Sequence, residues 1–203
     1  MSTLLLRLAA PLQSWGSDSK FERRTTERQP TKSGVIGLLA AALGRRRNES
    51  LDDLARLKFG VRIERPGQVM VDFHTAKSKA RRDPYVTRRY YLEDAMFLVG
   101  LEGDEGFLSN LEYAIKNPFF PLYLGRRSCP PTGEICIGLV DKSLEEALLE
   151  GCDNSTPIAL DSENVGAYRQ RDIPISFDPA YRRFAYRYIK SKTNHDAYEG
   201  VGE

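Results

Sequence analysis

Long apolar runs, paired cysteines and histidine are scarce in this 203-residue sequence. No stretch approaches the roughly 18 consecutive apolar residues that a membrane-spanning helix requires. The cysteines lack CxxC spacing and the sequence has only two histidines, so we expect neither a structural zinc site nor a cofactor. We expect the cysteines to be partly buried small hydrophobic residues of a cytoplasmic protein. They are Cys129, Cys136 and Cys152.

The amino terminus has only part of the pattern of a secretory signal peptide. In the opening stretch MSTLLLRLAAPLQSW, an apolar run leads to small residues, but no basic segment precedes the run. Arg7 interrupts the run after three leucines. A buried first β-strand over residues 3–8 fits the pattern better than a cleaved leader.

The sequence also has little excess of positive or negative charge, since the formal net charge is only +2. The distribution is nevertheless uneven. Basic residues concentrate in 20–32, 77–89 and 169–192, whereas acidic residues collect in 93–112 and 134–163. Segregated blocks predict a surface with a cationic side that can hold a polyanion and an anionic side left for other contacts.

Capping signals predict four helices. Thr31 or Ser33 can cap the first, which runs to about Leu43 and ends at Gly44. Ser50 can cap a short second helix with acidic residues in its first turn. The remaining two helices are predicted over 104–117 and 142–151.

Alternating and apolar segments predict the strands. Residues 59–65 and 68–77 alternate on either side of Pro66-Gly67, which is a hairpin signal. A long strand over 88–103 and a shorter one over 134–140 follow. Two further strands are predicted in the tail, over 156–162 and 182–190.

This order predicts an α+β fold. The first two-thirds follow the β-α-β-β-α-β order of a ferredoxin-like (RRM-like) body, with one extra short helix. Within it, residues of about 74–95 form a basic β-hairpin that projects as a thumb. The expected organisation is an RNA-binding body over 1–140 and a small β-containing region over 141–203, either a second lobe or an extension of the sheet.

A basic, threonine-rich segment leads directly into the first predicted helix. Backbone N–H groups at the start of a helix attract phosphate, and the hydroxyl and basic side chains here would add to that attraction. The KSG sequence matches part of a nucleotide-binding P-loop, but its leading glycine is missing, so ATP binding is not expected. The alternative is a capped helix after a solvated loop. The candidate phosphate contacts are Arg23, Arg24, Thr25, Arg28, Lys32 and Ser33.

The thumb segment mixes basic residues with tyrosines. This combination neutralises a backbone and stacks bases, which single-stranded RNA recognition requires. The alternative is a sheet edge defended by charge. The candidate contacts here are Lys77, Lys79, Arg81, Arg82, Arg88, Arg89 and Tyr90.

The same segment allows a catalytic alternative. A metal-independent ribonuclease needs a base, an acid and cationic stabilisation of the phosphorane, which His74, Lys77 and a tyrosine could supply. A lone histidine on an alternating strand is more often structural. We therefore expect binding, with a repeat-processing endoribonuclease as the alternative.

A proline- and aromatic-rich loop over 117–135 contains the Gly125-Arg126-Arg127 turn. Such a loop covers the core or seats a partner or RNA, and the residues leave both open. Arg126 and Arg127 are its candidate contacts.

Three stretches together resemble one family. LLLRLAAPLQSWG, PTKSGVIGLLAAALG with the preceding R-x-T, and YLGRRSCPPTGEI are similar to the CasD subunits of the subtype I-E CRISPR complex Cascade. The resemblance spans most of the chain and weakens after about residue 165. It implies a ferredoxin-like body with a thumb, and a subunit that holds the 5′ handle of CRISPR RNA.

The resemblance also implies partners. They are the guide RNA, the repeated backbone subunit CasC, the large subunit CasA, and CasB and CasE, with target DNA met only indirectly. In this arrangement the chain caps the handle and joins the large subunit to the backbone. A related subgroup cleaves repeat RNA itself, whereas the subtype I-E motifs favour a binding role.

A third hypothesis is a protein–protein adaptor whose basic blocks meet an acidic partner.

Overall fold

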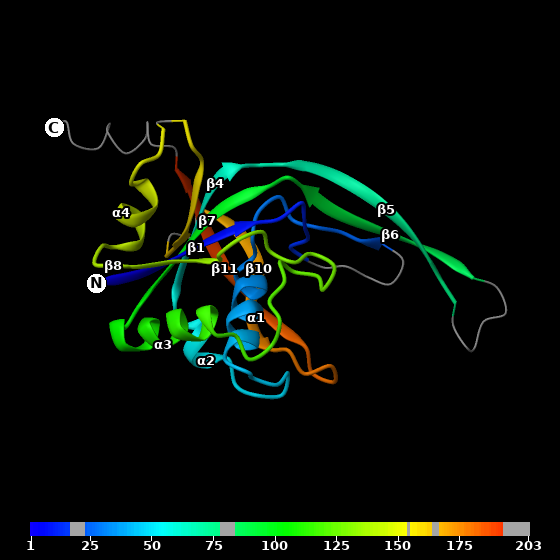
Figure 1. Cartoon of the computed structure of the whole chain (residues 1–203), viewed down its shortest axis with the longest axis horizontal. Coiled ribbons are helices and arrows are strands. Elements are labelled where there is room, and N and C mark those ends of the chain that lie inside the picture. Colours follow the sequence, from blue (N-terminus) through cyan, green and yellow to red (C-terminus); the bar gives the residue numbers. More distant parts are fainter. Residues whose placement is uncertain (17–22, 78–83, 154, 164–166, 193–203) are drawn as a thin grey trace.

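The computed structural model describes residues 1–16, 23–77, 84–153, 155–163 and 167–192 (Figure 1). A seven-stranded sheet has the order β10-β11-β9-β4-β7-β1-β8, and a smaller sheet joins β2, β6, β3 and β5. The prediction of an α+β fold is confirmed. The strands are β1 Ser2–Ala9, β2 Leu12–Gln13, β3 Arg23–Arg24, β4 Lys58–Arg65, β5 Gln68–Ala76, β6 Tyr85–Glu93, β7 Met96–Gly103, β8 Cys136–Val140, β9 Ile158–Ser162, β10 Tyr168–Ser176 and β11 Arg183–Lys192. The helices are α1 Lys32–Ala42, α2 Asp52–Ala55, α3 Glu105–Lys116 and α4 Leu144–Leu149.

The central strands of the large sheet are antiparallel to their neighbours. β1 pairs with β7 on one side and β8 on the other, and β4 pairs with the far edge of β7. Because β1 lies inside the sheet, nearly all its side chains are buried, and Arg7 is the exposed exception. The predicted first strand is therefore confirmed.

The two faces of the sheet carry different helices. Leu4, Leu6 and Leu8 of β1 join the main core beneath α1 and α3, while Leu5 points to α4 on the other face. Figure 1 shows α1, α2 and α3 on one side and α4 on the opposite side. Alternation along a strand produces this division.

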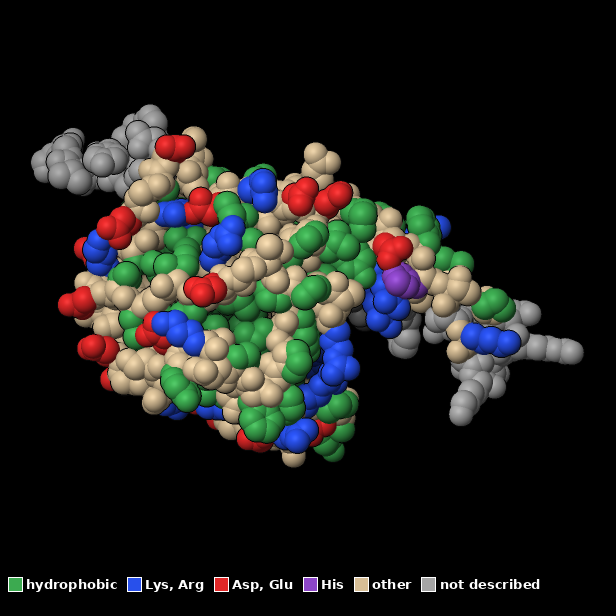
Figure 2. Space-filling view, in the orientation of Figure 1, with side chains coloured by type: hydrophobic (Ala, Val, Ile, Leu, Met, Phe, Trp, Pro, Cys, Tyr) green, Lys and Arg blue, Asp and Glu red, His purple; other side chains and the backbone are tan. Residues whose placement is uncertain are grey.

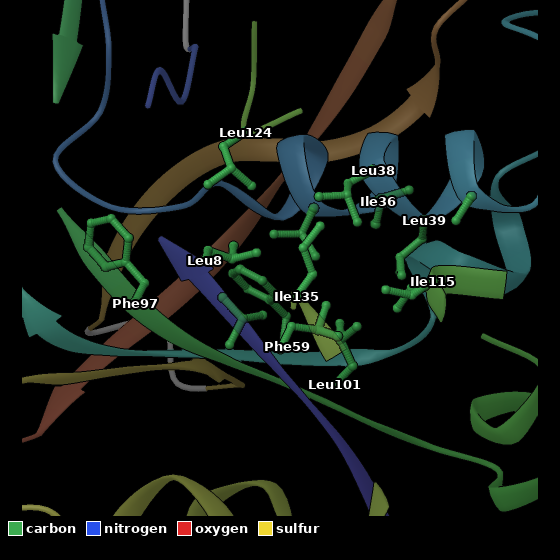
Figure 3. Packing of buried hydrophobic residues seen from close by; sticks show 14 of the residues in the cluster. Leu8, Ile36, Leu38, Leu39, Phe59, Phe97, Leu101, Ile115, Leu124 and Ile135 are labelled. Atoms are coloured by element: carbon green, nitrogen blue, oxygen red, sulfur yellow. The ribbon is translucent and has the colours of Figure 1, made fainter. Parts of the chain in front are cut away.

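The main core lies between the sheet and α1 (Figure 3). One buried cluster contains Phe59 and Phe97 from the sheet and Ile36 and Leu39 from α1, and each of these side chains is at most 1% exposed. Burial of one such side chain stabilises the fold by about 1.5–3 kcal/mol. This core holds the start of α1 in place.

Helix α1 begins and ends where its sequence predicts. The Thr31 hydroxyl accepts a hydrogen bond from the Gly34 N–H at 3.2 Å, and Gly44 follows the helix with φ +76°. A Cβ on Gly34 would lie 2.7 Å from the ring of Trp15, which is fully buried. The glycine at this position therefore allows α1 to pack closely against Trp15.

The second helix is capped differently from the prediction. Its N-cap is Leu51, which makes no side-chain cap hydrogen bond. Ser50 lies one residue before this N-cap, and its hydroxyl accepts a hydrogen bond from the Asp52 N–H at 3.2 Å.

The hairpin assignments need correction. Residues on either side of Pro66-Gly67 do not pair with each other, because β4 stays in the large sheet while β5 pairs with β6. The predicted long strand over 88–103 is two strands. Asp94, with φ 53°, separates β6 from β7. The projecting hairpin seen in Figure 1 is therefore β5–β6.

The C-terminal strands extend the large sheet. β9 pairs with β4, β11 with β9, and β10 with β11. β9 and β11 match the two predicted tail strands, whereas β10 was not predicted. Among the described residues, no helix has the length and apolar character to span a membrane.

Candidate nucleic-acid interface

The basic segment 23–28 before α1, which we call the arm, meets the thumb, which in the structure is the β5–β6 hairpin, in one small sheet. Strand β3 of the arm pairs in parallel with β6, so that Arg23 lies opposite Arg88 and Arg24 opposite Arg89. Two basic blocks that are far apart in the sequence are thereby placed side by side. Figure 2 shows basic side chains gathered beneath the hairpin where it leaves the body.

One face of this sheet is exposed. Arg23 donates from Nη2 to the Tyr90 hydroxyl at 2.9 Å, and its guanidinium carbon lies 5.7 Å from the centre of that ring. Arg88, two residues from Tyr90 and hence on the same face, lies over the Phe73 ring at 5.8 Å. Both arginines are exposed, so their charges are open to a ligand while aromatic rings restrict their motion.

The opposite face is closed by Arg126. Its guanidinium carbon lies 4.7 Å from the centre of the buried Tyr91 ring. Its Nη2 donates to the Arg24 carbonyl at 2.7 Å and to the Thr25 carbonyl at 3.4 Å. Arg126 therefore fixes the backbone of the arm. Sequence reasoning placed it among the ligand contacts and missed this positioning contact.

The loop that carries Arg126 is held by a tight turn. The Leu124 N–H donates to the Cys129 carbonyl at 2.8 Å, and the Ser14 N–H donates to the Leu124 carbonyl at 3.2 Å. Gly125 has φ +87°, and a Cβ there would lie 1.7 Å from the Ser14 carbonyl oxygen. Only glycine fits, because both the dihedral angle and the contact exclude a side chain.

Trp15 anchors the other end of the arm. Its N–H donates to the Thr26 hydroxyl at 2.9 Å, and its carbonyl accepts from the Glu27 N–H at 2.7 Å. The indole N–H donates to Gln13 at 3.1 Å inside the core. The described part of the arm is thus held at both ends.

The structure places Lys32 in a different role. This residue is 5% exposed, and its ammonium pairs with Asp161 at 3.0 Å. The prediction of a phosphate contact by its side chain is therefore corrected, since the charge is buried and neutralised. Ser33 is half-buried and donates to the Thr31 hydroxyl at 3.4 Å.

Lys32 belongs to a buried ion network. Arg187 donates to Asp172 at 2.6 and 2.9 Å and to Asp161 at 2.7 Å, and Asp172 also accepts from the Lys32 backbone N–H at 2.8 Å. Burial disfavours the charge on Arg187, but the two carboxylates outweigh it and raise the pKa of its guanidinium above the usual value. The network ties β9, β10 and β11 to the start of α1.

The remaining candidates divide by exposure. Exposed side chains are Arg24, Arg28, Lys77 and Arg127; Thr25 and Arg89 are half-buried. Lys79, Arg81 and Arg82 lie outside the described residues.

The catalytic alternative gains no support from the hairpin. His74 Nε2 contacts Asp72 on the same strand. His74 pairs with Thr87, three residues before Tyr90, so His74 and Tyr90 point to opposite faces. Among the described residues, no cluster of histidine, cysteine or carboxylate side chains is arranged to hold a metal ion.

The chain is similar to known CRISPR-associated proteins. Residues 3–190 match the family described as CRISPR-associated protein (Cas_Cas5). The chain is 37% identical over 216 residues to "CRISPR system Cascade subunit CasD" of Escherichia coli (strain K12), with 92% of this chain and 93% of that protein covered. The predicted resemblance to CasD is thereby confirmed.

Two solved structures are similar in both sequence and fold. One, described as "Crystal structure of Cas protein", is 45% identical with a TM-score of 0.78 and 94% of each chain covered. The other, a chain of a "CRISPR RNA-guided surveillance complex", is 34% identical with a TM-score of 0.83 and covers 94% of this chain and 89% of that chain. The chain therefore belongs to the CRISPR-associated protein (Cas_Cas5) family.

Proposed function

We propose that this chain is the Cascade subunit that binds the 5′ handle of the CRISPR RNA, caps it and joins the backbone to the large subunit. The similar Escherichia coli protein is named a Cascade subunit, and a similar chain belongs to an RNA-guided surveillance complex. The observation that carries the proposal is the parallel pairing of β3 with β6, because it brings the two basic blocks to one surface.

In this mechanism the exposed arginines bind successive phosphates. Arg23 is held by Tyr90 before RNA arrives, so little side-chain freedom remains to be lost on binding. Arg88 lies beside it, and Tyr90 offers a ring for a splayed base. Arg126 and Thr25 act as positioning residues that keep the arm against β6.

The body supports this role by its topology. The order β4-β7-β1-β8, with α1 following β1 and α3 following β7, supports a ferredoxin-like (RRM-like) assignment. We propose that residues 1–140 supply the RNA surface. Within the region 141–203, strands β9, β10 and β11 support it from the edge of the sheet, where the buried ion network reaches α1.

Contacts with other subunits are proposed for the thumb. Val69, Val71, Phe73 and Val86 are 41%, 38%, 62% and 55% exposed. Alternation and the β5–β6 register put all four on the face that also carries Arg88 and Tyr90, so a protein contact there would adjoin the bound RNA. An exposed apolar face of this kind favours a protein partner, and we propose CasC there, with CasA meeting another surface of the subunit.

We propose that the subunit binds RNA without cleaving it. The contact of His74 with Asp72 and its orientation away from Tyr90 do not form the acid–base arrangement of a ribonuclease. RNA cleavage is therefore the outcome that would contradict this role.

The test uses purified full-length protein and a labelled RNA carrying a CRISPR repeat 5′ handle, in EDTA. Native and denaturing gels are run from the same samples. We expect a salt-sensitive shift with intact RNA. Loss of two single-strand phosphate contacts in Arg23→Ala/Arg24→Ala should reduce the logarithmic salt slope by about 1.4.

The matched control is Arg46→Ala/Arg47→Ala, which removes the same charge from two exposed positions outside the interface. It should leave both affinity and slope close to the unmodified protein. Equal weakening by the two variants would contradict the assigned surface. Cleaved RNA, abolished by His74→Ala, would instead select the endoribonuclease. RNase-resistant capture of CasC with no RNA shift would select the adaptor.

A further inference from the structure

The outer edge of the large sheet carries a second group of basic and aromatic side chains. In the β10–β11 pair, Arg169 lies opposite Tyr188 and Arg171 opposite Tyr186. Residues two apart on a strand share a face, so these four side chains form two adjacent arginine–tyrosine pairs on one surface.

This surface is on the α4 side of the sheet. Lys192, which shares the strand face of Tyr186 and Tyr188, pairs with Glu145 of α4. Helix α4 packs against β1, β4, β7 and β9, which leaves the outward face of β10–β11 beyond its cover. The arm proposed to hold the RNA handle leads into α1, which packs on the opposite face.

The inward and outward arginines of these strands have different environments. Inward Arg187 is 6% exposed and neutralised by Asp161 and Asp172. Outward Arg169 and Arg171 are exposed, and no carboxylate among the described residues pairs with either. The fold therefore uses the inward charge and leaves the outward charges available.

The outward arginines stack on an exposed ring. The Arg169 guanidinium carbon lies 3.8 Å from the centre of the Tyr186 ring and that of Arg171 lies 5.9 Å from it, while Tyr186 is 50% exposed. Beyond it, Arg182 lies over Phe184 at 5.3 Å. Two cations share one ring, and within the described part of the chain neither forms a salt bridge, an arrangement that a polyanion would stabilise.

Edge protection accounts for only part of this pattern. Charges on edge strand β10 discourage pairing with another chain. Tyr186, however, lies on β11, which has a neighbour on both sides, so its exposed ring does not protect the edge. Flat sheet surfaces with exposed aromatic rings and guanidinium planes bind single strands by stacking their bases.

We propose that the outward face of β10–β11 is a second site for single-stranded nucleic acid, with Tyr186 as its stacking platform and Arg169 and Arg171 as its phosphate contacts. Duplex is not the proposed ligand, because its bases are already stacked on one another. The contacts are to phosphates and base faces, which RNA and DNA share. The site requires no contribution from the handle-binding arm.

The test measures binding of fluorescein-labelled oligouridine and oligodeoxythymidine to the full-length protein by anisotropy over a series of salt concentrations. Tyr186→Ala should weaken binding about tenfold, while Tyr186→Phe, which keeps the ring, should bind like the unmodified protein. Arg169→Ala/Arg171→Ala should reduce the logarithmic salt slope by about 1.4. Arg46→Ala/Arg47→Ala is the control for charge, and thermal unfolding of each variant checks its fold.

Crosslinking of 4-thiouridine RNA locates the contact. The proposal expects adducts on the β11 peptide that disappear in Tyr186→Ala and persist in Arg23→Ala/Arg24→Ala. Adducts confined to the arm and thumb, with unmodified affinity in both β10–β11 variants, would overturn it. Persistence of the β11 adduct alongside failure of handle binding would refute the proposed function and leave this site standing. Tighter binding of oligouridine or of oligodeoxythymidine shows whether the site prefers RNA or DNA.

Discussion

Replacing Asp172 with alanine tests the buried network that joins the C-terminal strands to α1. Asp172 is 3% exposed and accepts hydrogen bonds from Arg187 at 2.6 and 2.9 Å and from the Lys32 N–H at 2.8 Å. The substitution leaves the buried Arg187 with Asp161 as its remaining carboxylate. Removing one partner of a buried ion pair costs about 3–5 kcal/mol, because the other charge stays buried.

This cost is large against a typical unfolding free energy of about 5–15 kcal/mol. For a chain of this size each kcal/mol lowers Tm by about 2–4 °C, so we expect Tm to fall by roughly 6–20 °C. Urea unfolding followed by fluorescence of Trp15, the only tryptophan, measures the free energy directly. Trp15 is 0% exposed, so its emission reports loss of the core.

Two further variants separate the network from a general effect of charge. The Asp141 side chain is 91% exposed and lies 3.5 Å from the terminal amine. Replacing it with alanine should lower the unfolding free energy by only about 0–1 kcal/mol. Asp172→Ala/Arg187→Met should recover part of the loss, because no unpaired charge then stays buried. A loss below about 1 kcal/mol for Asp172→Ala would refute the reasoning.

The other predictions concern pH, a glycine and the thiols. Burial opposes ionisation of Glu102, but hydrogen bonds from Lys58 and a helix N–H outweigh it and hold the pKa of this carboxyl below its ordinary value. The stability that Glu102 contributes is therefore fully present above the ordinary carboxyl pKa and is lost as pH falls through the lower pKa of the folded state. In urea titrations from about pH 6 to 3, the unfolding free energy should decline less steeply for Glu102→Gln than for the unmodified protein. Gly125→Ala should lower the unfolding free energy by about 1–3 kcal/mol and weaken handle binding, because it displaces the turn beneath the arm; unmodified values in urea titrations and gel shifts would contradict this. Burial raises the pKa of the Cys129 and Cys136 thiols, so mass spectrometry should find both unreactive toward iodoacetamide near pH 7.5 until urea unfolds the protein, and rapid native labelling would exclude their burial.

Local sequence signals predicted the elements well where one residue determines a boundary. Thr31 caps α1 with its hydroxyl, and Gly44 ends the helix because, without a Cβ, it adopts a positive φ. The strand break at Asp94 was missed, because an acidic residue with positive φ has no unique sequence signature. Pro66-Gly67 was interpreted as a hairpin turn, yet β5 turns away and finds its partner in β6.

Composition identified residues of the candidate site, but the sequence did not predict which of them are in contact. Charge density identified Arg23 and Arg88, but nothing in either segment indicates that β3 pairs in parallel with β6. Lys32 was assigned to phosphate because its partners, Asp161 and Asp172, are 129 and 140 residues away in the sequence. Contacts over such separations depend on the tertiary fold.

Strand β6 imposes unequal limits on insertion and deletion in this family. It pairs with β2, β3 and β5, and side chains on its two faces have separate roles. One residue added within 88–93 would exchange the faces of Tyr90 and Tyr91, and Arg126 would lose its ring. A residue added between Lys77 and Pro84 leaves that alternation intact. Related sequences should therefore drift in length between those two residues and keep the span from 88 to 93 constant.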